Sequence, residues 1–214
     1  MFTGIIEEIG RIQQIERGAR SSRLTISGDV IFSDLKLGDS VAVNGICLTA
    51  SGISGKQFSA DVMPETLDRT ALNVLSPGSS VNLERAMAAN GRFGGHIVSG
   101  HIDGVGRITQ IQPDDNAVRV RIGTETSILR YVIPKGSIAI DGISLTIAEV
   151  NSGGFVVSII PHTGAETTLL SKRSGDLVNL ENDMIGKYVE RLLSFQGEMS
   201  QSKITYEFLA EHGF

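Results

Sequence analysis

Short apolar segments, rich in valine and isoleucine and punctuated by glycine, recur along the chain. Examples span residues 23–27, 40–43, 57–62, 118–122, 137–140 and 155–160, and most are flanked by glycine, asparagine or aspartate. Short Val- and Ile-rich runs that end at turn residues are typical of antiparallel strands. Between neighbouring runs, Asn44-Gly45 and Asp141-Gly142 are strong signals for tight hairpins. The pattern therefore predicts a mainly β protein.

The second half of the chain repeats the first. Residues 41–49, VAVNGICLT, align with residues 138–146, IAIDGISLT, at an offset of 97. The same offset aligns residues 81–84 with 178–181, and an offset shorter by one residue aligns 3–5 with 99–101. A period of this length is the size of a small domain and is too long for a solenoid unit. We therefore predict two homologous domains, residues 1–95 and 96–185, which meet near the glycine-rich residues 90–95.

Each predicted domain holds about six short strands, and closure of these strands into a small barrel removes exposed sheet edges. Short helices are expected at residues 66–72 and 163–169. The expected fold is therefore a pair of homologous six-stranded antiparallel closed barrels, produced by an internal duplication.

The period of the pattern changes after the second copy. A set of apolar residues follows helical spacing behind Asp183, which can act as an N-cap: Met184, Ile185, Tyr188, Val189 and Leu192. Ile204, Phe208 and Leu209 predict a shorter helix that ends at His212-Gly213. The apolar stripe of the first helix needs a partner, and both a fold-back onto a barrel and a contact with other subunits would supply one. We treat residues 186–214 as a C-terminal helical segment for oligomerisation.

Composition narrows the classes of function. The 214 residues include 19 Lys+Arg and 24 Asp+Glu, a net charge of −5, and 41% are hydrophobic. A mildly acidic globular chain without a basic run lacks the positive surface charge that binds nucleic acid or an anionic membrane. No window approaches the roughly 18 consecutive apolar residues of a membrane helix, and residues 1–8 lack the basic start of an export signal. The single cysteine, Cys47, cannot form an internal disulfide, which fits a cytoplasmic protein.

A duplicated barrel predicts two similar sites for a small molecule, and the positions at which the copies differ are the most informative. The aligned pairs that differ are Asn44 and Asp141, Cys47 and Ser144, Glu65 and His162, and Ile5 and His101. Folding alone does not require these differences. They are therefore candidates for giving two bound molecules different chemical fates.

His101 lies beside a glycine-rich strand start and is a candidate for proton transfer, since the unperturbed imidazole pKa is about 6.5. A hydrogen-bonded structural role is the alternative for His101, and it is the favoured interpretation for His96 and His212. The spacing of His96 and His101 does not suit a zinc site. For Cys47 an inert packing role is the favoured alternative to a reactive thiol.

Several motifs taken together resemble one family. They are Met1-Phe2-Thr3-Gly4-Ile5, Asn44-Gly45-Ile46-Cys47-Leu48-Thr49, Pro64-Glu65-Thr66-Leu67, residues 94–104 (GGHIVSGHIDG) and residues 135–146 (KGSIAIDGISLT). In this order and at this duplicated spacing they resemble the riboflavin synthase alpha chain family over about residues 1–190. The resemblance implies two six-stranded barrels that each bind 6,7-dimethyl-8-ribityllumazine, and a C-terminal helix that helps to assemble a homotrimer.

The reaction that this resemblance implies is a dismutation, in which one lumazine donates a four-carbon unit to another. Its products are riboflavin and 5-amino-6-(D-ribitylamino)uracil, it is the final step of riboflavin biosynthesis, and no cofactor is expected. A proton must leave the C7 methyl of one lumazine while a nucleophile adds to the other. The active site is expected between the N-terminal barrel of one subunit and the C-terminal barrel of a neighbour, because two lumazines held in one site are already oriented for reaction.

The family motifs also imply the residues of the site. His101, Ser144, Cys47 and Thr146 are the catalytic candidates, and Phe2, Ser40, Lys135 and His96 are weaker ones. Substrate contacts are expected from Gly4, Ile5, Ile6, Cys47, Leu48, Thr49, Asp61, Val62, Met63, Pro64, Glu65, Thr66, Gly100, His101, Ile102, Lys135, Ser144, Leu145, Thr146, Ser158, Ile159, Ile160, Pro161, His162 and Thr163. No metal ligand is expected. The acidic Glu65 is replaced by His162 in the second copy, so the two barrels do not share that group.

A non-catalytic lumazine- or flavin-binding antenna protein of the same fold is the rival interpretation. Such a protein is expected to lose reactive groups in one half, whereas Cys47, His101 and Ser144 all remain here, which favours the enzyme. A structural module without a ligand leaves the differences between the copies unexplained. The sequence does not decide which barrel holds the donor, whether Cys47 acts covalently, or whether the chain associates with lumazine synthase.

Overall fold

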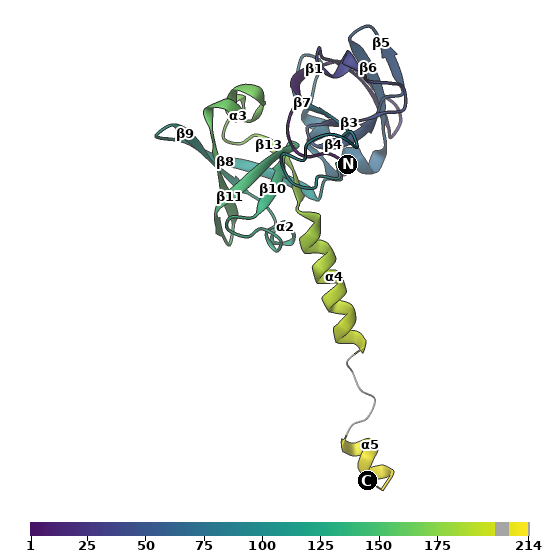
Figure 1. Cartoon of the computed structure of the whole chain (residues 1–214), viewed down its shortest axis with the longest axis vertical. Helices are drawn as coiled ribbons and strands as arrows, with labels where there is room; N and C mark the ends of the chain where they lie inside the picture. Colours follow the sequence, from purple (N-terminus) through teal and green to yellow (C-terminus); the bar gives the residue numbers. More distant parts are fainter. Residues whose placement is uncertain (200–205, 214) are drawn as a thin grey trace. The chain divides into compact units, whose positions relative to one another are not determined.

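The computed structural model describes residues 1–199 and 206–213. It consists of two compact units, Met1–Asp183 and Met184–Phe214. The first unit contains two separate β-sheets, one in purple and blue and one in teal and green (Figure 1). The second unit is helical and is described by itself below.

The first repeat forms a seven-stranded antiparallel sheet. Its strands follow the order β4-β3-β7-β1-β2-β6-β5. They are β1 (Glu8–Arg17), β2 (Ser22–Ser27), β3 (Ser40–Val43), β4 (Ile46–Thr49), β5 (Gly52–Ser54), β6 (Gln57–Val62) and β7 (Ser80–Arg85).

The second repeat forms a closed antiparallel barrel in the order β10-β11-β12-β9-β8-β13, with β13 pairing with β8. Its strands are β8 (Gly104–Asp114), β9 (Ala117–Gly123), β10 (Ser137–Ile140), β11 (Ile143–Asn151), β12 (Gly154–Ile159) and β13 (Leu177–Asn182). The mainly β fold with duplicated sheets is thus confirmed, and the predicted strands lie within a residue of those observed.

The prediction of two fully closed barrels needs a correction in the first repeat. β11 is one strand with an irregularity in register between Ile147 and Glu149, while the matching stretch of the first repeat is split into β4 and β5. Both repeats have the same backbone hydrogen bond at this corner, from Ala50 to the carbonyl of Asp39 and from Ile147 to the carbonyl of Gly136, each at 2.9 Å, so this bond does not account for the split. A bulge lets a strand turn a barrel corner, and at the same corner the ladder of the first sheet is interrupted, so that this sheet stays open. We call this open sheet the first barrel and the closed one the second barrel.

Short helices occupy the same places in both repeats. α1 (Pro64–Arg69) and α3 (Pro161–Glu166) each begin with proline, whose missing N–H has no intrahelical partner at that position anyway. The remaining short elements are the 3₁₀ turns η1 (Ile31–Ser33), η2 (Ala71–Val74) and η3 (Leu169–Ser171), and the single-turn helix α2 (Thr126–Leu129).

Each sheet encloses its own apolar core. Alternate residues of β3 and β4, such as Val41 and Leu48, point into the first core, and Ile138 and Leu145 do the same in the second. The residues between them therefore lie on the outer surface of each barrel. This alternation places Cys47 on the outside of the first barrel and Ser144 on the outside of the second.

The first residues of each repeat form an arm that packs on the other repeat. Phe2 and Val98 pair with each other as an isolated antiparallel bridge, and both are buried with the outer alanines of β3 and β10. Beyond that crossing, Ile6 packs against the core of the second barrel and Ile102 against the core of the first. We call residues 2–6 the first arm and residues 98–102 the second arm.

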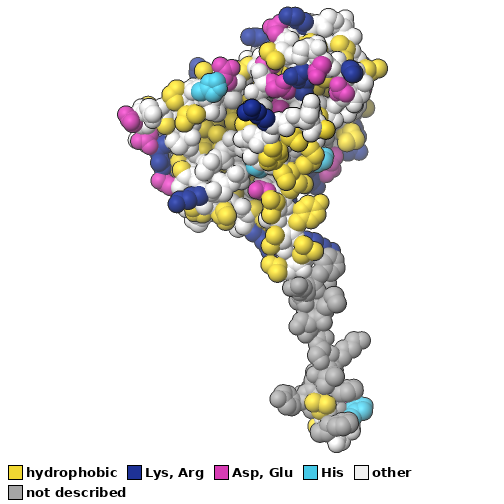
Figure 2. All heavy atoms as spheres, viewed as in Figure 1, with side chains coloured by type: hydrophobic (Ala, Val, Ile, Leu, Met, Phe, Trp, Pro, Cys, Tyr) yellow, Lys and Arg dark blue, Asp and Glu magenta, His cyan; other side chains and the backbone are white. Residues whose placement is uncertain are grey.

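The second unit contains α4 (Met184–Met199) and α5 (Tyr206–Glu211), so the prediction of a longer and a shorter helix is confirmed. The apolar residues that the sequence placed on one stripe of the longer helix include Ile185, Tyr188, Val189 and Leu192, and all four are exposed (Figure 2). Ile204 lies outside the described residues. None of the described helices combines the length and the hydropathy needed to cross a bilayer.

Candidate functional site

Two hairpin turns meet tip to tip between the barrels. Asn44 and Gly45 have φ values of 45° and 79°, and Asp141 and Gly142 have values of 46° and 81°. Two successive positive φ values give the type I′ turn, which matches the twist of the strands that it joins. A Cβ on Gly45 would lie 2.7 Å from the amide N of Gly142, and a Cβ on Gly142 would lie 2.8 Å from that of Gly45. Because each glycine makes the same contact with the other, the two turns are arranged as by an approximate twofold axis.

The first candidate site lies on the outer surface of the first barrel. Cys47 and Thr49 point outward from β4, and Ser40 of β3 lies opposite Thr49 in the ladder. The second arm covers this strand, because the carbonyl of Gly100 accepts a hydrogen bond from the amide of Cys47 at 2.9 Å. The arm thereby brings His101, whose side chain is exposed, to the surface that carries Cys47. We call this surface the Cys47 site.

The second candidate site has the same construction on the second barrel. Ser144 and Thr146 point outward from β11, and the amide of Ser144 donates to the carbonyl of Gly4 at 2.8 Å. The first arm therefore covers β11 and brings Ile5 to the place that His101 occupies at the other site. We call this surface the Ser144 site. The sequence predicted all of these residues, but it did not indicate that each arm serves the opposite barrel.

Glycine is required at both crossings. Gly4 and Gly100 have φ values of 77° and 85°, in the left-handed region that glycine adopts without strain. A Cβ on Gly4 would lie 2.6 Å from the Cβ of Ser144, and a Cβ on Gly100 would lie 2.5 Å from the Cβ of Cys47. The arm backbones can therefore lie directly on the two candidate reactive residues.

Ser144 has a histidine partner. The Nδ1 atom of His96 lies 2.7 Å from the hydroxyl oxygen of Ser144. His96 is buried, and this burial lowers its pKa, with the charge of Asp183 acting in the opposite direction. Its Nε2 atom has no hydrogen-bond partner among the described residues. A neutral imidazole next to a hydroxyl can accept its proton, so His96 belongs to the Ser144 site, a role that sequence reasoning ranked below a structural one.

The other predicted residues lie on or beside the same two surfaces. Asp61 and Met63 are exposed at the end of β6, and Ser158 and Ile160 are exposed at the end of β12. The side chains of four predicted residues point into the cores, so that only their backbones can meet a ligand: Leu48, Val62, Leu145 and Ile159.

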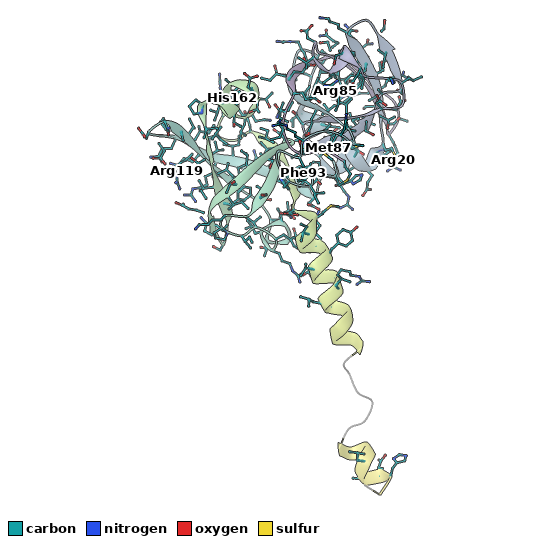
Figure 3. All side chains as sticks on the ribbon, in the orientation of Figure 1. Arg20, Arg85, Met87, Phe93, Arg119 and His162 are labelled. Carbon is teal, nitrogen blue, oxygen red and sulfur yellow. The ribbon has the colours of Figure 1, made fainter. Side chains whose placement is uncertain are left out.

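The first turns of α1 and α3 continue these surfaces. Glu65 pairs with Arg69 within α1, while His162 is exposed at the start of α3 (Figure 3). The carbonyls of Thr66 and Thr163 accept hydrogen bonds from Thr70 and Thr167 at 2.6 and 2.7 Å. Pro64 and Pro161, which precede them, begin the two helices.

Lys135 is held in an unusual backbone conformation. Its φ is 65°, at the position where the first repeat has Gly38, and its amide donates to Ile147 at 2.8 Å. A side chain in the left-handed region carries strain of about 1–2 kcal/mol. Strained residues cluster at functional sites, which singles out Lys135, exposed two residues before Ser137 of β10, the residue that pairs with Thr146 of β11.

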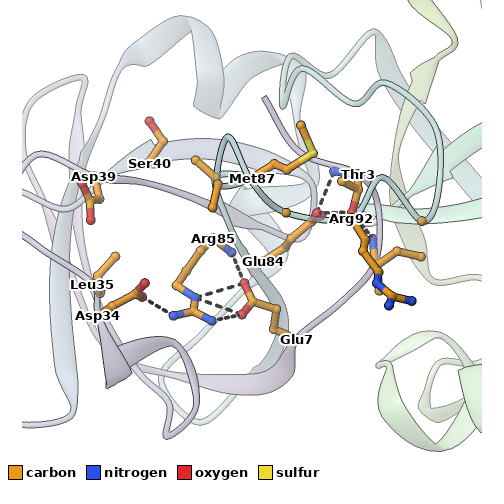
Figure 4. A pocket seen from close by; sticks show the side chains of 15 residues that line it. Thr3, Glu7, Asp34, Leu35, Asp39, Ser40, Glu84, Arg85, Met87 and Arg92 are labelled. Carbon is orange, nitrogen blue, oxygen red and sulfur yellow. Dashed lines mark hydrogen bonds and ion pairs between the residues drawn. The ribbon is translucent and has the colours of Figure 1, made fainter.

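A cavity of about 540 Å³ lies beside the first barrel and meets the predicted site only at Ile5 and Ser40 (Figure 4). Arg85 crosses it and is bound by Glu7, with an Nε to Oε2 distance of 2.9 Å, and by Asp34. The hydrogen bonds that Arg85 donates to Glu7 raise the pKa of Arg85 further above its already high value. Met87, in the segment that connects the two repeats, forms another part of the wall (Figure 4). Neither Cys47 nor Ser144 lines this cavity, so the two outer surfaces remain the candidate sites.

The comparisons with known proteins agree with this geometry. A family model described as a lumazine binding domain matches residues 3–86 and again residues 99–183. Riboflavin synthases of Actinobacillus pleuropneumoniae and of Bacillus subtilis are 54% and 51% identical to the chain, and the match covers 100% of both proteins in each case.

Solved structures give the same fold. The crystal structure of LumP complexed with riboflavin has a TM-score of 0.80 and 26% identity, over 85% of this chain and 99% of that chain. LumP complexed with 6,7-dimethyl-8-(1'-D-ribityl) lumazine has a TM-score of 0.78 at the same identity and coverage. With its two outer sites and its full-length relatives, the chain belongs to the riboflavin synthase family and contains two lumazine-binding domains.

Proposed function

We propose that the chain converts two molecules of 6,7-dimethyl-8-ribityllumazine into riboflavin and 5-amino-6-(D-ribitylamino)uracil by transfer of a four-carbon unit. The observation that carries this proposal is the presence of two equivalent outer sites with different reactive groups. One site combines Cys47 with His101, and the other combines Ser144 with His96. Two copies of one substrate can therefore bind in the same manner and react differently.

The first site supplies proton transfer. His101 is exposed and stands on the arm that covers Cys47. A neutral imidazole can remove a proton from an acidic methyl group and return one later. We assign this role to His101, acting on the C7 methyl of the lumazine bound beside Cys47 and Thr49.

The second site supplies a polarised hydroxyl. Ser144 can pass its proton toward Nδ1 of His96, which makes its oxygen a better nucleophile or hydrogen-bond acceptor toward the second lumazine. Thr146, two residues along the same strand, faces the same way and extends the contact surface. No group of three or more His, Cys, Asp or Glu side chains in the described part of the chain is arranged to hold a metal ion, and we propose no step through one.

The ligand contacts belong to the outer surfaces and the arms. We propose that the lumazine ring lies along the outward residues of β4 or β11, and that the ribityl chain reaches the ends of β6 or β12 and the start of the following helix. The printed titles of the LumP complexes name riboflavin and ribityllumazine as ligands of a similar fold, which supports the same ligand class here.

The complete active site is proposed to form between subunits of a homotrimer, with the first barrel of one subunit facing the second barrel of another and a lumazine on each. The exposed apolar side chains of α4 support an assembly role for residues 186–214. We further propose that residues 1–95 and 96–185 act as the two lumazine-binding units. A cytoplasmic location and an association with lumazine synthase remain predictions.

Mixed oligomers test this arrangement. His101→Gln disables the Cys47 site of its own chain, and Ser144→Ala disables the Ser144 site of its own chain. In a mixed trimer, some interfaces combine the intact Cys47 site of one variant with the intact Ser144 site of the other. Co-expression of the two differently tagged variants is therefore expected to restore riboflavin formation that neither variant shows alone.

The matched control is a mixed trimer of one variant in two tags, which has no intact pair of sites. Mixed trimers of the two variants that stay as slow as this control would contradict a site shared between subunits. His101→Gln should also bind lumazine nearly as well as the wild type, because proton transfer acts mainly in the transition state.

A further inference from the structure

The last strand of each barrel carries a buried glutamate that accepts hydrogen bonds from the crossing arm. Oε1 of Glu84 on β7 accepts hydrogen bonds from the amide and the hydroxyl of Thr3, both at 2.7 Å, and Oε2 accepts one from the amide of Gly4 at 3.0 Å. The side chain is only 4% exposed. All three donors belong to the first arm, which starts from this barrel and crosses to the other.

The second repeat has the same set of contacts. Oε1 of Glu181 on β13 accepts from the amide and the hydroxyl of Ser99, both at 2.7 Å, and Oε2 accepts from the amide of Gly100 at 3.0 Å. Glu181 is 1% exposed. The duplication has therefore kept the carboxylate, the hydroxyl and the glycine amide together, although Thr3 has become Ser99.

These contacts run crosswise between the barrels. Glu84 stands on the first barrel, but the glycine that it holds lies against Ser144 of the second. Glu181 stands on the second barrel, and the glycine that it holds lies against Cys47 of the first. Ile5 and His101, the arm residues that reach the two sites, directly follow these glycines.

A buried carboxylate is unfavourable unless its oxygens are hydrogen-bonded, and burial raises the pKa of Glu84 even though Thr3 and Gly4 donate to it. The strand ladders do not need the charge, because β7 and β13 pair through their backbones. Three hydrogen bonds from the arm to one carboxylate can all form in only one position of the arm. The arm is the element that this arrangement fixes.

We propose that Glu84 and Glu181 are positioning residues that act crosswise, Glu84 on the Ser144 site and Glu181 on the Cys47 site with His101. The proposal rests on the proposed function for the identity of the two sites. The contact itself does not depend on the reaction: in each case a carboxylate of one barrel holds the arm that covers the site on the other barrel.

Cys47 is a built-in reporter, because it is the only cysteine of the chain and the second arm covers it. In the full chain, the rate at which its thiol reacts with 5,5′-dithiobis(2-nitrobenzoate) measures how often that arm lifts. Glu181→Gln is expected to raise this rate at least about tenfold, the factor that loss of one hydrogen bond to a charged group gives a local opening. Glu84→Gln is the matched control and should leave the rate within about twofold.

The reverse experiment uses Cys47→Ser with Ser144→Cys, which moves the only thiol to the other site. In that background Glu84→Gln should accelerate labelling and Glu181→Gln should not. Equal acceleration by both variants, or by neither, in the two backgrounds would overturn the crosswise assignment. If a glutamine variant does not fold, Thr3→Val and Ser99→Ala each remove one hydroxyl donor to the same carboxylates and are expected to give a smaller effect in the same pattern.

Riboflavin formation by the two glutamine variants completes the test. Both are expected to lose at least about tenfold in kcat, and wild-type kcat in both would overturn a role in positioning the reaction. Absence of riboflavin formation by the wild-type chain would refute the proposed function, while the labelling pattern would still decide whether each glutamate holds the arm of the opposite site.

Discussion

The Gly4→Ala substitution is expected to lower the free energy of unfolding by about 3 kcal/mol and to remove most of the activity, although it adds only one methyl group. Gly4 is the residue at which the first arm touches Ser144, where its carbonyl accepts the Ser144 amide hydrogen at 2.8 Å. The substitution therefore tests whether the arm lies on the opposite barrel.

Two contributions make up this magnitude. Gly4 has a φ of 77°, and the left-handed conformation costs an ordinary residue about 1–2 kcal/mol. The new Cβ would also lie 2.6 Å from the Cβ of Ser144 and 2.8 Å from its amide N, and overpacking of this kind costs about 1–3 kcal/mol. The arm can avoid the overlap only by leaving Ser144, which breaks the hydrogen bond and disturbs the buried Phe2.

Gly38→Ala is the matched control. Gly38 has a φ of 92°, and nothing lies within 4 Å of the Cβ that would be added. This variant carries the backbone strain without the steric contact, so it should lose only about 1 kcal/mol. Urea unfolding of both variants and the wild type measures the difference. A Gly4→Ala variant that loses no more stability than Gly38→Ala would refute the contact between the arm and Ser144.

Two other substitutions give measurable outcomes. Lys135 adopts the left-handed region with a φ of 65°, so Lys135→Gly should raise the free energy of unfolding by about 1 kcal/mol. The same variant should weaken lumazine binding in a fluorescence titration. A less stable variant would contradict the strain argument. Burial lowers the pKa of His96, so the unfolded chain binds a proton that the folded chain resists, and the stability present above about pH 6.5 is lost as the pH falls below it. His96→Gln should flatten this decline in a plot of Tm against pH between about 5 and 7, and an unchanged slope would show that another group causes it.

Much of the fold could be predicted from local signals. Short Val- and Ile-rich runs between turn residues placed the strands. Asn44-Gly45 and Asp141-Gly142 predicted the two turns because type I′ geometry needs positive φ at both positions. The repeat then predicted the second barrel from the first. The break between β4 and β5 was not predicted, since the repeats align without a gap there and share the hydrogen bond made by Ala50 and by Ile147.

The candidate site was predicted in its residues but not in its arrangement. The differences at Cys47 and Ser144 marked the two surfaces, because folding does not require them. The exchange of the arms joins Gly4 to Ser144 across 140 positions, and periodicity carries no information at that separation. The repeated glutamates at 84 and 181 were the available signal, since a buried carboxylate needs several donors nearby.

The most direct measurement mixes the purified, metal-free chain with 6,7-dimethyl-8-ribityllumazine and follows absorbance, with chromatography of both products. The account predicts steady turnover in which two lumazines disappear for each riboflavin and each 5-amino-6-(D-ribitylamino)uracil formed, without an added cofactor. Tight fluorescent binding without riboflavin would contradict it and indicate an antenna protein of the same fold, and absence of binding would contradict both interpretations.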